Sequence, residues 1–246
     1  MDDQAPRVLG DLLARERRSD APALLAPALD RAYDYHRLLT NAWKTGNFLR
    51  HLGVREGTVV AVVADPVPEA VLSVHGAALL GATVRVLPPG ERAPEARALV
   101  APADRLAASD PDAATQCVVY GAPPDDPSVS YFERDVWSEN PTEPPDVVAP
   151  ETPLLTDGDE EYTHRQVLAA ARSVVEEWSL DATSRVAVRA SLSDPGTVVV
   201  GLVAPLLAGA ATLFPDDEAR GTLAVATDDA PEAMCCSPED VLDGSA

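Results

Sequence analysis

Residues 58–88 have the sequence TVVAVVADPVPEAVLSVHGAALLGATVRVLP, and this stretch decides the fold. Residues 58–64 form a short continuous apolar run, which is typical of a strand buried on both faces of a parallel sheet. After the turn ADPVP, residues 69–80 are apolar on nearly every face and predict a buried helix. Gly81 ends that helix, and ATVRVLP predicts the next strand. This order predicts a βαβ unit.

The same order of elements recurs about half a chain later. Residues 184–190 (SRVAVRA) predict a buried strand, residues 195–207 an apolar helix, and AATLFP the strand after it. An amphipathic helix is expected before each unit, over residues 36–52 and from residue 162. The two copies align at near-constant spacing: His36-Arg37 with His164-Arg165, Gly81 with Gly209, and Pro88 with Pro215. Trp43 and Trp178 are expected on equivalent helix faces, as core residues.

Two repeats are too few for a solenoid. They predict an α/β fold of two Rossmann-like lobes, each with a parallel sheet, related by a pseudo-two-fold axis. A Pro- and acid-rich stretch near residues 140–150 predicts the boundary. We therefore expect residues 1–147 to form a first α/β lobe with an N-terminal helix and hairpin, and residues 148–246 a second α/β lobe.

The composition is strongly acidic, with 40 acidic and 19 basic residues and a formal net charge of −21. Such a field repels nucleic acid and anionic membranes, so neither is expected as a partner. Lys44 is the sole lysine. This acidic, Ala-rich, Lys-poor composition resembles that of proteins from salt-in halophilic archaea. An acidic protein from a GC-rich bacterium is the alternative.

Compartment signals favour the cytoplasm. Cys117, Cys235 and Cys236 do not make a disulfide framework. The N-terminal residues lack the basic start and apolar core of a signal peptide. The longest apolar run, TVVVGLVAPLLAGAATLF, is interrupted by Pro205 and two glycines, so no membrane span is expected.

Three segments, in order, resemble the AMP-forming acyl-CoA synthetases. Residues 33–89 are similar to the opening of that family's large domain, where a TYAEL helix leads to LGVRPGDRVA, an apolar helix and GAVVVPLNP. Residues 154–174 resemble the THRN helix that follows the family's phosphate loop, and residues 201–215 the next helix and strand. The resemblance covers most of this chain and about the first half of a typical family member. It implies the large-domain fold and, for the family, acid–CoA ligase activity with ATP, Mg²⁺ and CoA.

The family's phosphate loop is rich in Ser, Thr and Gly and ends in Pro-Lys-Gly, so that N–H groups, hydroxyls and a lysine hold phosphate. The matching position, residues 155–162, has the sequence LTDGDEEY. Thr156, Asp157 and Gly158 are the remnant of the loop and the expected cofactor-binding residues. Four acids lie within residues 157–161, and carboxylates repel a triphosphate. The resemblance places the second essential lysine and the base-binding motifs after residue 246, and Lys44 lies on the first-lobe helix.

The acidic loop, the cysteines and the histidines each have a possible chemical role and a possible structural role. The acidic loop could hold a divalent cation, but its spacing does not follow an EF-hand. The adjacent pair Cys235-Cys236 does not have the C-x₂-C spacing of zinc sites. We therefore expect no metal site and no catalytic residue. His75 is predicted to be a hydrogen-bonded core residue, and His36 and His164 to share a structural role.

The leading hypothesis is a catalytically inactive pseudoenzyme that acts as a binding or regulatory subunit. Its partner would be a protein or a second copy of itself, with a weakly bound nucleotide or acyl ligand and no cofactor. The alternative is half of a split AMP-forming acyl-CoA ligase that a second polypeptide completes. A third possibility, a plain Rossmann-like binding domain, predicts no two-fold relation between residues 35–88 and 162–215.

Overall fold

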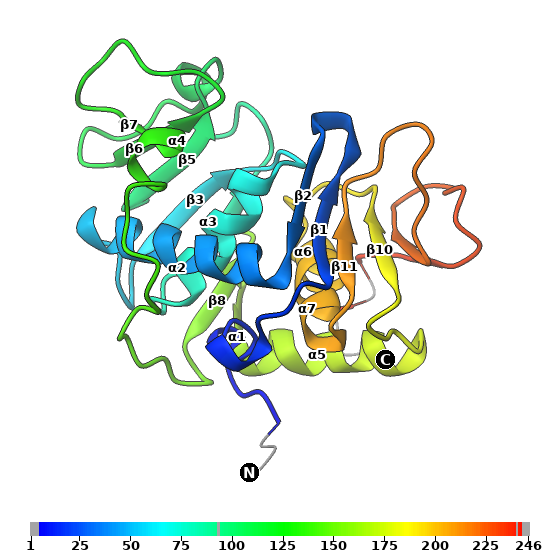
Figure 1. Ribbon diagram of the computed structural model, residues 1–246. Helices are drawn as coiled ribbons and strands as arrows, with labels where there is room; N and C mark the ends of the chain where they lie inside the picture. Colours follow the sequence, from blue (N-terminus) through cyan, green and yellow to red (C-terminus); the bar gives the residue numbers. More distant parts are fainter. Residues whose placement is uncertain (1–4, 93, 240, 243–246) are drawn as a thin grey trace.

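The computed structural model describes residues 5–92, 94–239 and 241–242. Two β-sheets lie side by side, and helices pack between them (Figure 1). In sheet A the strands run in the order β13 (Cys235–Cys236), β12 (Leu223–Val225), β10 (Arg185–Val188), β11 (Ala211–Leu213), β1 (Pro22–Ala26) and β2 (Arg31–Asp34).

Sheet B, like sheet A, is a parallel sheet with one antiparallel hairpin at an edge. Its strands run in the order β7 (Ser130–Tyr131), β6 (Gln116–Tyr120), β5 (Ala98–Pro102), β3 (Val59–Val63), β4 (Thr83–Leu87), β8 (Pro153–Thr156) and β9 (Glu161–Thr163). Every neighbouring pair is parallel except the hairpins β1–β2 and β8–β9. The predicted α/β fold with two largely parallel sheets is confirmed.

The helices follow the repeat as well. The first repeat contains α2 (Tyr35–His51) and α3 (Pro68–Ala78), and the second contains α5 (His164–Glu177) and a long helix in three parts, namely α6 (Pro195–Val198), a π-helical segment (Val199–Val203) and α7 (Ala204–Ala208). Short helices are α1 (Leu9–Leu12), α4 (Phe132–Asp135) and the 3-10 turns Arg15–Arg17, Pro27–Leu29 and Leu106–Ser109.

The two repeats exchange their hairpins. The β1–β2 hairpin of the first repeat joins sheet A, where Leu24 pairs with Thr212 of β11. The β8–β9 hairpin of the second repeat joins sheet B, where Leu155 pairs with Val84 of β4. Each sheet therefore contains strands from both sides of residue 147, the expected domain boundary. The outer ends of the two expected domains, residues 1–4 and 243–246, lie outside the described residues.

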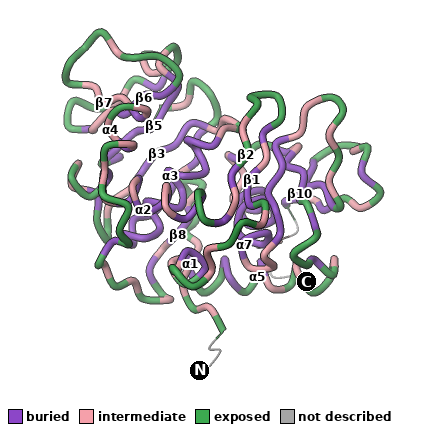
Figure 2. The backbone as a smooth tube through the Cα atoms, in the orientation of Figure 1, coloured by how far each residue is buried: buried purple, intermediate pink, exposed green. Residues whose placement is uncertain are grey.

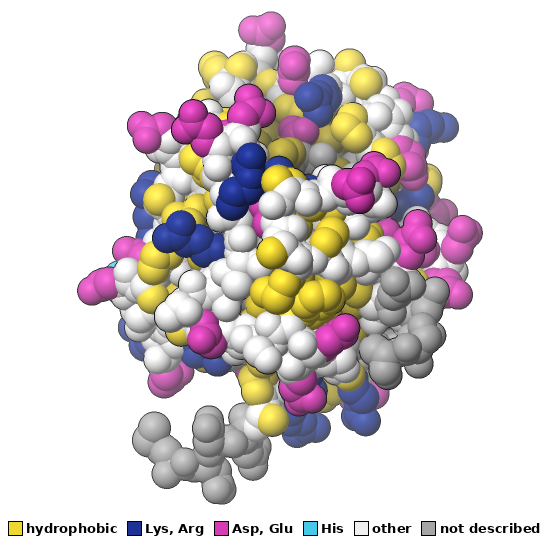
Figure 3. Space-filling view, turned by 90° about the vertical axis from the view of Figure 1, so that its right-hand side faces the viewer, with side chains coloured by type: hydrophobic (Ala, Val, Ile, Leu, Met, Phe, Trp, Pro, Cys, Tyr) yellow, Lys and Arg dark blue, Asp and Glu magenta, His cyan; other side chains and the backbone are white. Residues whose placement is uncertain are grey.

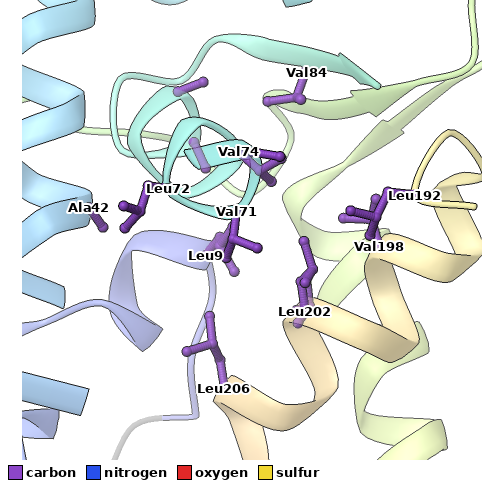
Figure 4. Packing of buried hydrophobic residues seen from close by; sticks show 14 of the residues in the cluster. Leu9, Ala42, Val71, Leu72, Val74, Val84, Leu192, Val198, Leu202 and Leu206 are labelled. Atoms are coloured by element: carbon purple, nitrogen blue, oxygen red, sulfur yellow. The ribbon is translucent and has the colours of Figure 1, made fainter. Parts of the chain in front are cut away.

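One continuous core joins the two repeats (Figure 4). Leu9 of α1 lies between Val71 of α3 and Leu206 of α7, and Leu202 of the π-helical segment faces the same cluster. The opposite face of each sheet, which we call the outer face, carries a smaller apolar cluster. Buried residues accordingly follow the strands and inner helices, while the connecting loops are exposed (Figure 2).

Pro205 explains why the second long helix differs from α3. Proline has no N–H, so it cannot donate to the carbonyl of Gly201, four residues earlier. The helix widens into a π-helical segment at this point, a known response to a break in the hydrogen-bond ladder. The buried hydroxyl of Thr212 donates to the Gly201 carbonyl instead, at 2.6 Å. The strand beneath the helix thus supplies the missing donor.

The structure corrects the alignment of the repeats by one residue. Asp34 and Thr163 are the N-caps of α2 and α5, and each accepts a backbone N–H three residues on. Tyr35, not His36, is therefore equivalent to His164. Tyr35 is buried like His164, whereas His36 is exposed. The expected shared role of His36 and His164 is wrong.

Two further expectations about core residues need correction. Trp43 is fully buried in the middle of α2, whereas Trp178 is partly exposed and caps the end of α5, so the two are not equivalent. Trp43 lies nine residues after the N-cap Asp34 (43 − 34) and Trp178 fifteen after the N-cap Thr163 (178 − 163), so they occupy different helix positions. His75 is buried as predicted, but neither ring nitrogen has a hydrogen-bond partner among the described residues.

Candidate functional site

The remnant of the phosphate loop is the turn that joins β8 to β9. Residues 157–160 connect the strands, and Thr156 pairs with Glu161 at their ends. The Thr156 hydroxyl accepts a hydrogen bond from the N–H of Gly158 at 3.0 Å and donates one to the carbonyl of Glu160 at 2.7 Å. Gly158 has a φ of 108°, which L side chains rarely adopt. Thr156 and Gly158 therefore act together to close a tight turn.

The carboxylate of Asp157 occupies the remaining backbone donors of this turn. Its Oδ1 accepts hydrogen bonds from the N–H groups of Asp159 and Glu160, both at 2.8 Å. These bonds, the one from Glu160 first, hold the pKa of Asp157 below its ordinary value. Successive N–H groups that converge on one point form an anion-binding nest. The anion in this nest is the protein's own side chain.

A cleft of about 590 Å³ adjoins the turn. It lies between the β8–β9 hairpin, the start of α6 and the segment after β13, and its charged lining residues are Asp157, Asp194 and Glu239. Asp194 caps α6 by accepting the N–H of Gly196 at 2.7 Å. A Cβ on Gly196 would lie 2.0 Å from the carbonyl oxygen of Pro238, so glycine allows this close approach. No Lys or Arg is among the described residues that line the cleft.

Arg85 is the cation nearest to the turn, and the sequence analysis missed it. It lies on β4 in register with Thr156, and a Cβ on Gly158 would be 2.8 Å from its Nη2. Its charge adds a smaller part to the lowered pKa of Asp157. Arg85 is already paired, because Nη2 donates to Glu91 Oε1 at 2.7 Å. The signal that could have found it is a single charge inside the otherwise apolar strand TVRVL.

The structure brings together the three remnant residues Thr156, Asp157 and Gly158, whose ligand binding stays a prediction. Within residues 5–92, 94–239 and 241–242, no three His, Cys, Asp or Glu side chains are grouped to hold a metal ion. Cys117 and Cys235 are free thiols, and burial raises the pKa of Cys117. No helix in the described part of the chain is long and apolar enough to cross a bilayer.

The two largely parallel sheets match the fold of the N-terminal part of the large domain of adenylate-forming enzymes. The sequence model of the AMP-binding enzyme family matches residues 13–150, which is more than half of the chain. The chain therefore belongs to the AMP-binding enzyme family. No curated protein matches it in sequence.

Solved structures of ligases and synthetases share its fold. An anthranilate CoA ligase, AuaEII, in complex with anthranoyl-AMP has a TM-score of 0.75 and 22% identity over 89% of this chain. The N-terminal domain of FACL13 from Mycobacterium tuberculosis has a TM-score of 0.70 and 19% identity over 89% of the chain. The nonribosomal peptide synthetase FmoA3 gives a TM-score of 0.71 and 20% identity over 89%. The chain spans 49%, 62% and 24% of these three structures, respectively.

Proposed function

We propose that the chain is an acyl-CoA synthetase-like protein that binds a ligand or partner and does not adenylate. The observation that carries the proposal is the carboxylate of Asp157 on the N–H groups of Asp159 and Glu160. A nucleotide phosphate needs the same donors, so it must displace a negative charge that the chain itself supplies.

Electrostatics around the turn support the same conclusion. Adenylation builds charge on the leaving pyrophosphate, and enzymes stabilise that charge with preorganised donors and cations. The turn contains Asp157, Asp159 and Glu160, and Glu161 follows it. Arg85 is the neighbouring cation, and its charge is offset by Glu91. Loss of one preorganised donor costs about a hundredfold or more in rate. In this turn, the side chains of Thr156 and Asp157 occupy the N–H groups of residues 158, 159 and 160.

The second candidate is a half of a split AMP-forming ligase. It is supported by the match of the AMP-binding enzyme model to residues 13–150, which is compatible with the family's ligase chemistry. In that case a second polypeptide would supply the cations and base-binding groups. The turn would then have to open, with Asp157 leaving its own N–H groups.

The test of activity is the acid-dependent exchange of pyrophosphate into ATP by the intact chain at molar KCl with Mg²⁺. We expect no exchange with acetate, medium-chain, long-chain or aryl acids. Exchange above background that is lost in Thr156→Val or Asp157→Ala would show that the turn is catalytic. Exchange that arises when a neighbouring gene product is added would establish the split enzyme.

The partner in this proposal is a second protein or a second copy of the chain. Among the described residues, the large hydrophobic side chains that are exposed are Leu29 and Val147, so an interface would be largely polar. Light scattering at high salt is the measurement. A clean monomer with no partner recovered would contradict the binding role. We also place the protein in the cytoplasm, because Cys117 and Cys235 are free thiols.

A further inference from the structure

A second cavity, of about 330 Å³, lies at the tip of the β1–β2 hairpin on the outer face of sheet A. Its apolar surface comes from Leu25 and Leu213, which are register partners on β1 and β11, and from Ala219 in the loop after β11. This volume is near the lower end of the range for small-molecule pockets, which begins at about 300 Å³. The cavity is therefore large enough for a compact organic ligand.

Three arginines line this cavity. Arg31 is paired with Glu69 at 2.6 Å, and Glu69 is almost fully buried. Arg220 donates Nη1 to the backbone carbonyls of Asp217 and Ala219, both at 2.9 Å. The exposed guanidinium of Arg185 has no hydrogen-bond or ion-pair partner in the described part of the chain. Two of the three guanidinium groups thus keep donors for a ligand.

This concentration of cations is unusual for a chain with 40 acidic and 19 basic residues. Asp30 is the one carboxylate among the described residues that line the cavity, against three arginines. Eight arginines of the chain form ion pairs with carboxylates in the described structure. Arg185 is one of the ten arginines (18 − 8) without such an ion pair in the described structure, and it is the one of these ten that lines the cavity together with Arg220. Figure 3 shows the face on the right-hand side of Figure 1, where Lys and Arg side chains lie among acidic and hydrophobic ones.

We propose that this cavity binds a small organic carboxylate. The carboxylate would accept hydrogen bonds from the guanidinium groups of Arg185 and Arg220, because planar guanidinium forks match carboxylate oxygens. The apolar body of the ligand would lie against Leu25 and Leu213. The site is separate from the turn at Asp157, so this proposal holds or fails independently of the absence of adenylation.

Calorimetric titration of the full chain at fixed ionic strength tests the proposal. The probes are benzoate and hexanoate, with benzamide as the neutral counterpart of benzoate. We expect one or both carboxylates to bind, benzamide to bind at least about tenfold more weakly, and Arg185→Gln to weaken carboxylate binding at least about tenfold. Arg220→Gln should act in the same direction.

The matched control is Arg55→Gln, which removes one positive charge from an exposed position outside the cavity. It should change carboxylate binding by less than about twofold, as expected for a screened distant charge. The melting temperature of each variant verifies that it is folded, and the unpaired Arg185 side chain should be replaced without loss of stability. No binding of either carboxylate, equal binding of benzamide, or equal losses in Arg185→Gln and Arg55→Gln would each overturn the proposal.

Discussion

The two exchanged hairpins have the same geometry and opposite electrostatics. Each is antiparallel, has a four-residue turn (residues 27–30 and 157–160), and leads into a capped helix. Each adds to the sheet of the other repeat. The residue that follows the turn is Arg31 in the first hairpin and Glu161 in the second. The first turn borders a cavity with three arginines, and the second borders a cleft with three carboxylates.

This difference shows that the pairing of a hairpin with its sheet and the anion binding at its turn depend on different residues. Hairpin pairing depends on backbone hydrogen bonds and on alternating buried side chains, which both repeats keep. Anion binding depends on a few donors and charges at the turn. In the second hairpin Asp157 satisfies those donors internally. The turn of the second hairpin can therefore be closed to an external anion without any change in the fold.

Expressing the two repeats as separate fragments should have the largest effect on folding. Neither residues 1–147 nor residues 148–246 should fold alone, because each fragment lacks the hairpin that completes its sheet and exposes half of the shared core. We expect no cooperative thermal transition from either fragment and a restored transition when the two are mixed. Circular dichroism provides the measurement. A cooperative melt of one isolated fragment would show that the lobes are independent.

Acid should reveal two buried histidines, one in each repeat. Burial lowers the pKa of His75 and of His164 from 6.5 to about 4. The unfolded chain therefore binds more protons than the folded chain between pH 6.5 and 4, so stability falls as pH falls through this window. The loss is about 3 kcal/mol for each histidine by pH 4. His164 Nδ1 also accepts the N–H of Leu9 at 3.0 Å, so protonation would remove that bond.

The variant His75→Leu isolates one of these contributions. It should flatten the fall in stability between pH 6.5 and 4 relative to the wild type, as measured by urea unfolding. Thr197→Val, a change at a buried side chain that does not titrate, is the control and should leave the slope unchanged. Equal slopes for His75→Leu and the wild type would contradict burial of a neutral ring.

Salt should act more on the second repeat than on the first. Residues 148–246 contain 18 acidic and 5 basic residues, against 22 and 14 in residues 1–147. Raising KCl to the molar range screens this self-repulsion, and we expect a gain of about 2 kcal/mol, or about 5 °C in melting temperature. Hydrogen exchange should show the larger gain in protection in residues 148–246. An unchanged melting temperature would remove the argument for a halophilic protein.

The smallest expected effect concerns the interrupted helix at Pro205. Thr212→Val removes the donor to the carbonyl of Gly201 and should destabilise the protein by about 1 to 3 kcal/mol. Thr197→Val makes the same change at a buried hydroxyl that has no partner among the described residues, and it should be neutral or stabilising. Chemical unfolding compares the two. Equal effects would show that the Thr212 bond is not what compensates for proline.

The sequence predicted the elements well and their pairing poorly. Continuous apolar runs located β3, α3 and β4 and their counterparts, because burial on both faces leaves a local signature. The exchange of hairpins leaves no such signature, since pairing partners lie far apart in the chain. The alignment of His36 with His164 failed because identical residue types were matched where the N-caps Asp34 and Thr163 fix the helix starts.

The candidate site was predicted in its residues and not in its contacts. The acidic sequence of residues 157–161 indicated repulsion of phosphate, but the bonds from Asp157 to its own turn depend on backbone geometry that composition does not reveal. Arg85 was missed because it belongs to a strand distant in sequence that the sheet brings beside the turn. The arginine cavity was missed because its residues come from three separate segments.

The central claim is that the carboxylate of Asp157 occupies the anion nest of the turn. Pyrophosphate binding at fixed ionic strength, without Mg²⁺, measures this directly in the wild type and in two variants. Asp157→Ala frees the N–H groups of Asp159 and Glu160, whereas Asp159→Ala removes the same charge from the same turn and leaves the nest occupied. We expect undetectable binding in the wild type and in Asp159→Ala, and measurable binding in Asp157→Ala alone. Binding by the wild type that Asp157→Ala weakens would contradict the claim.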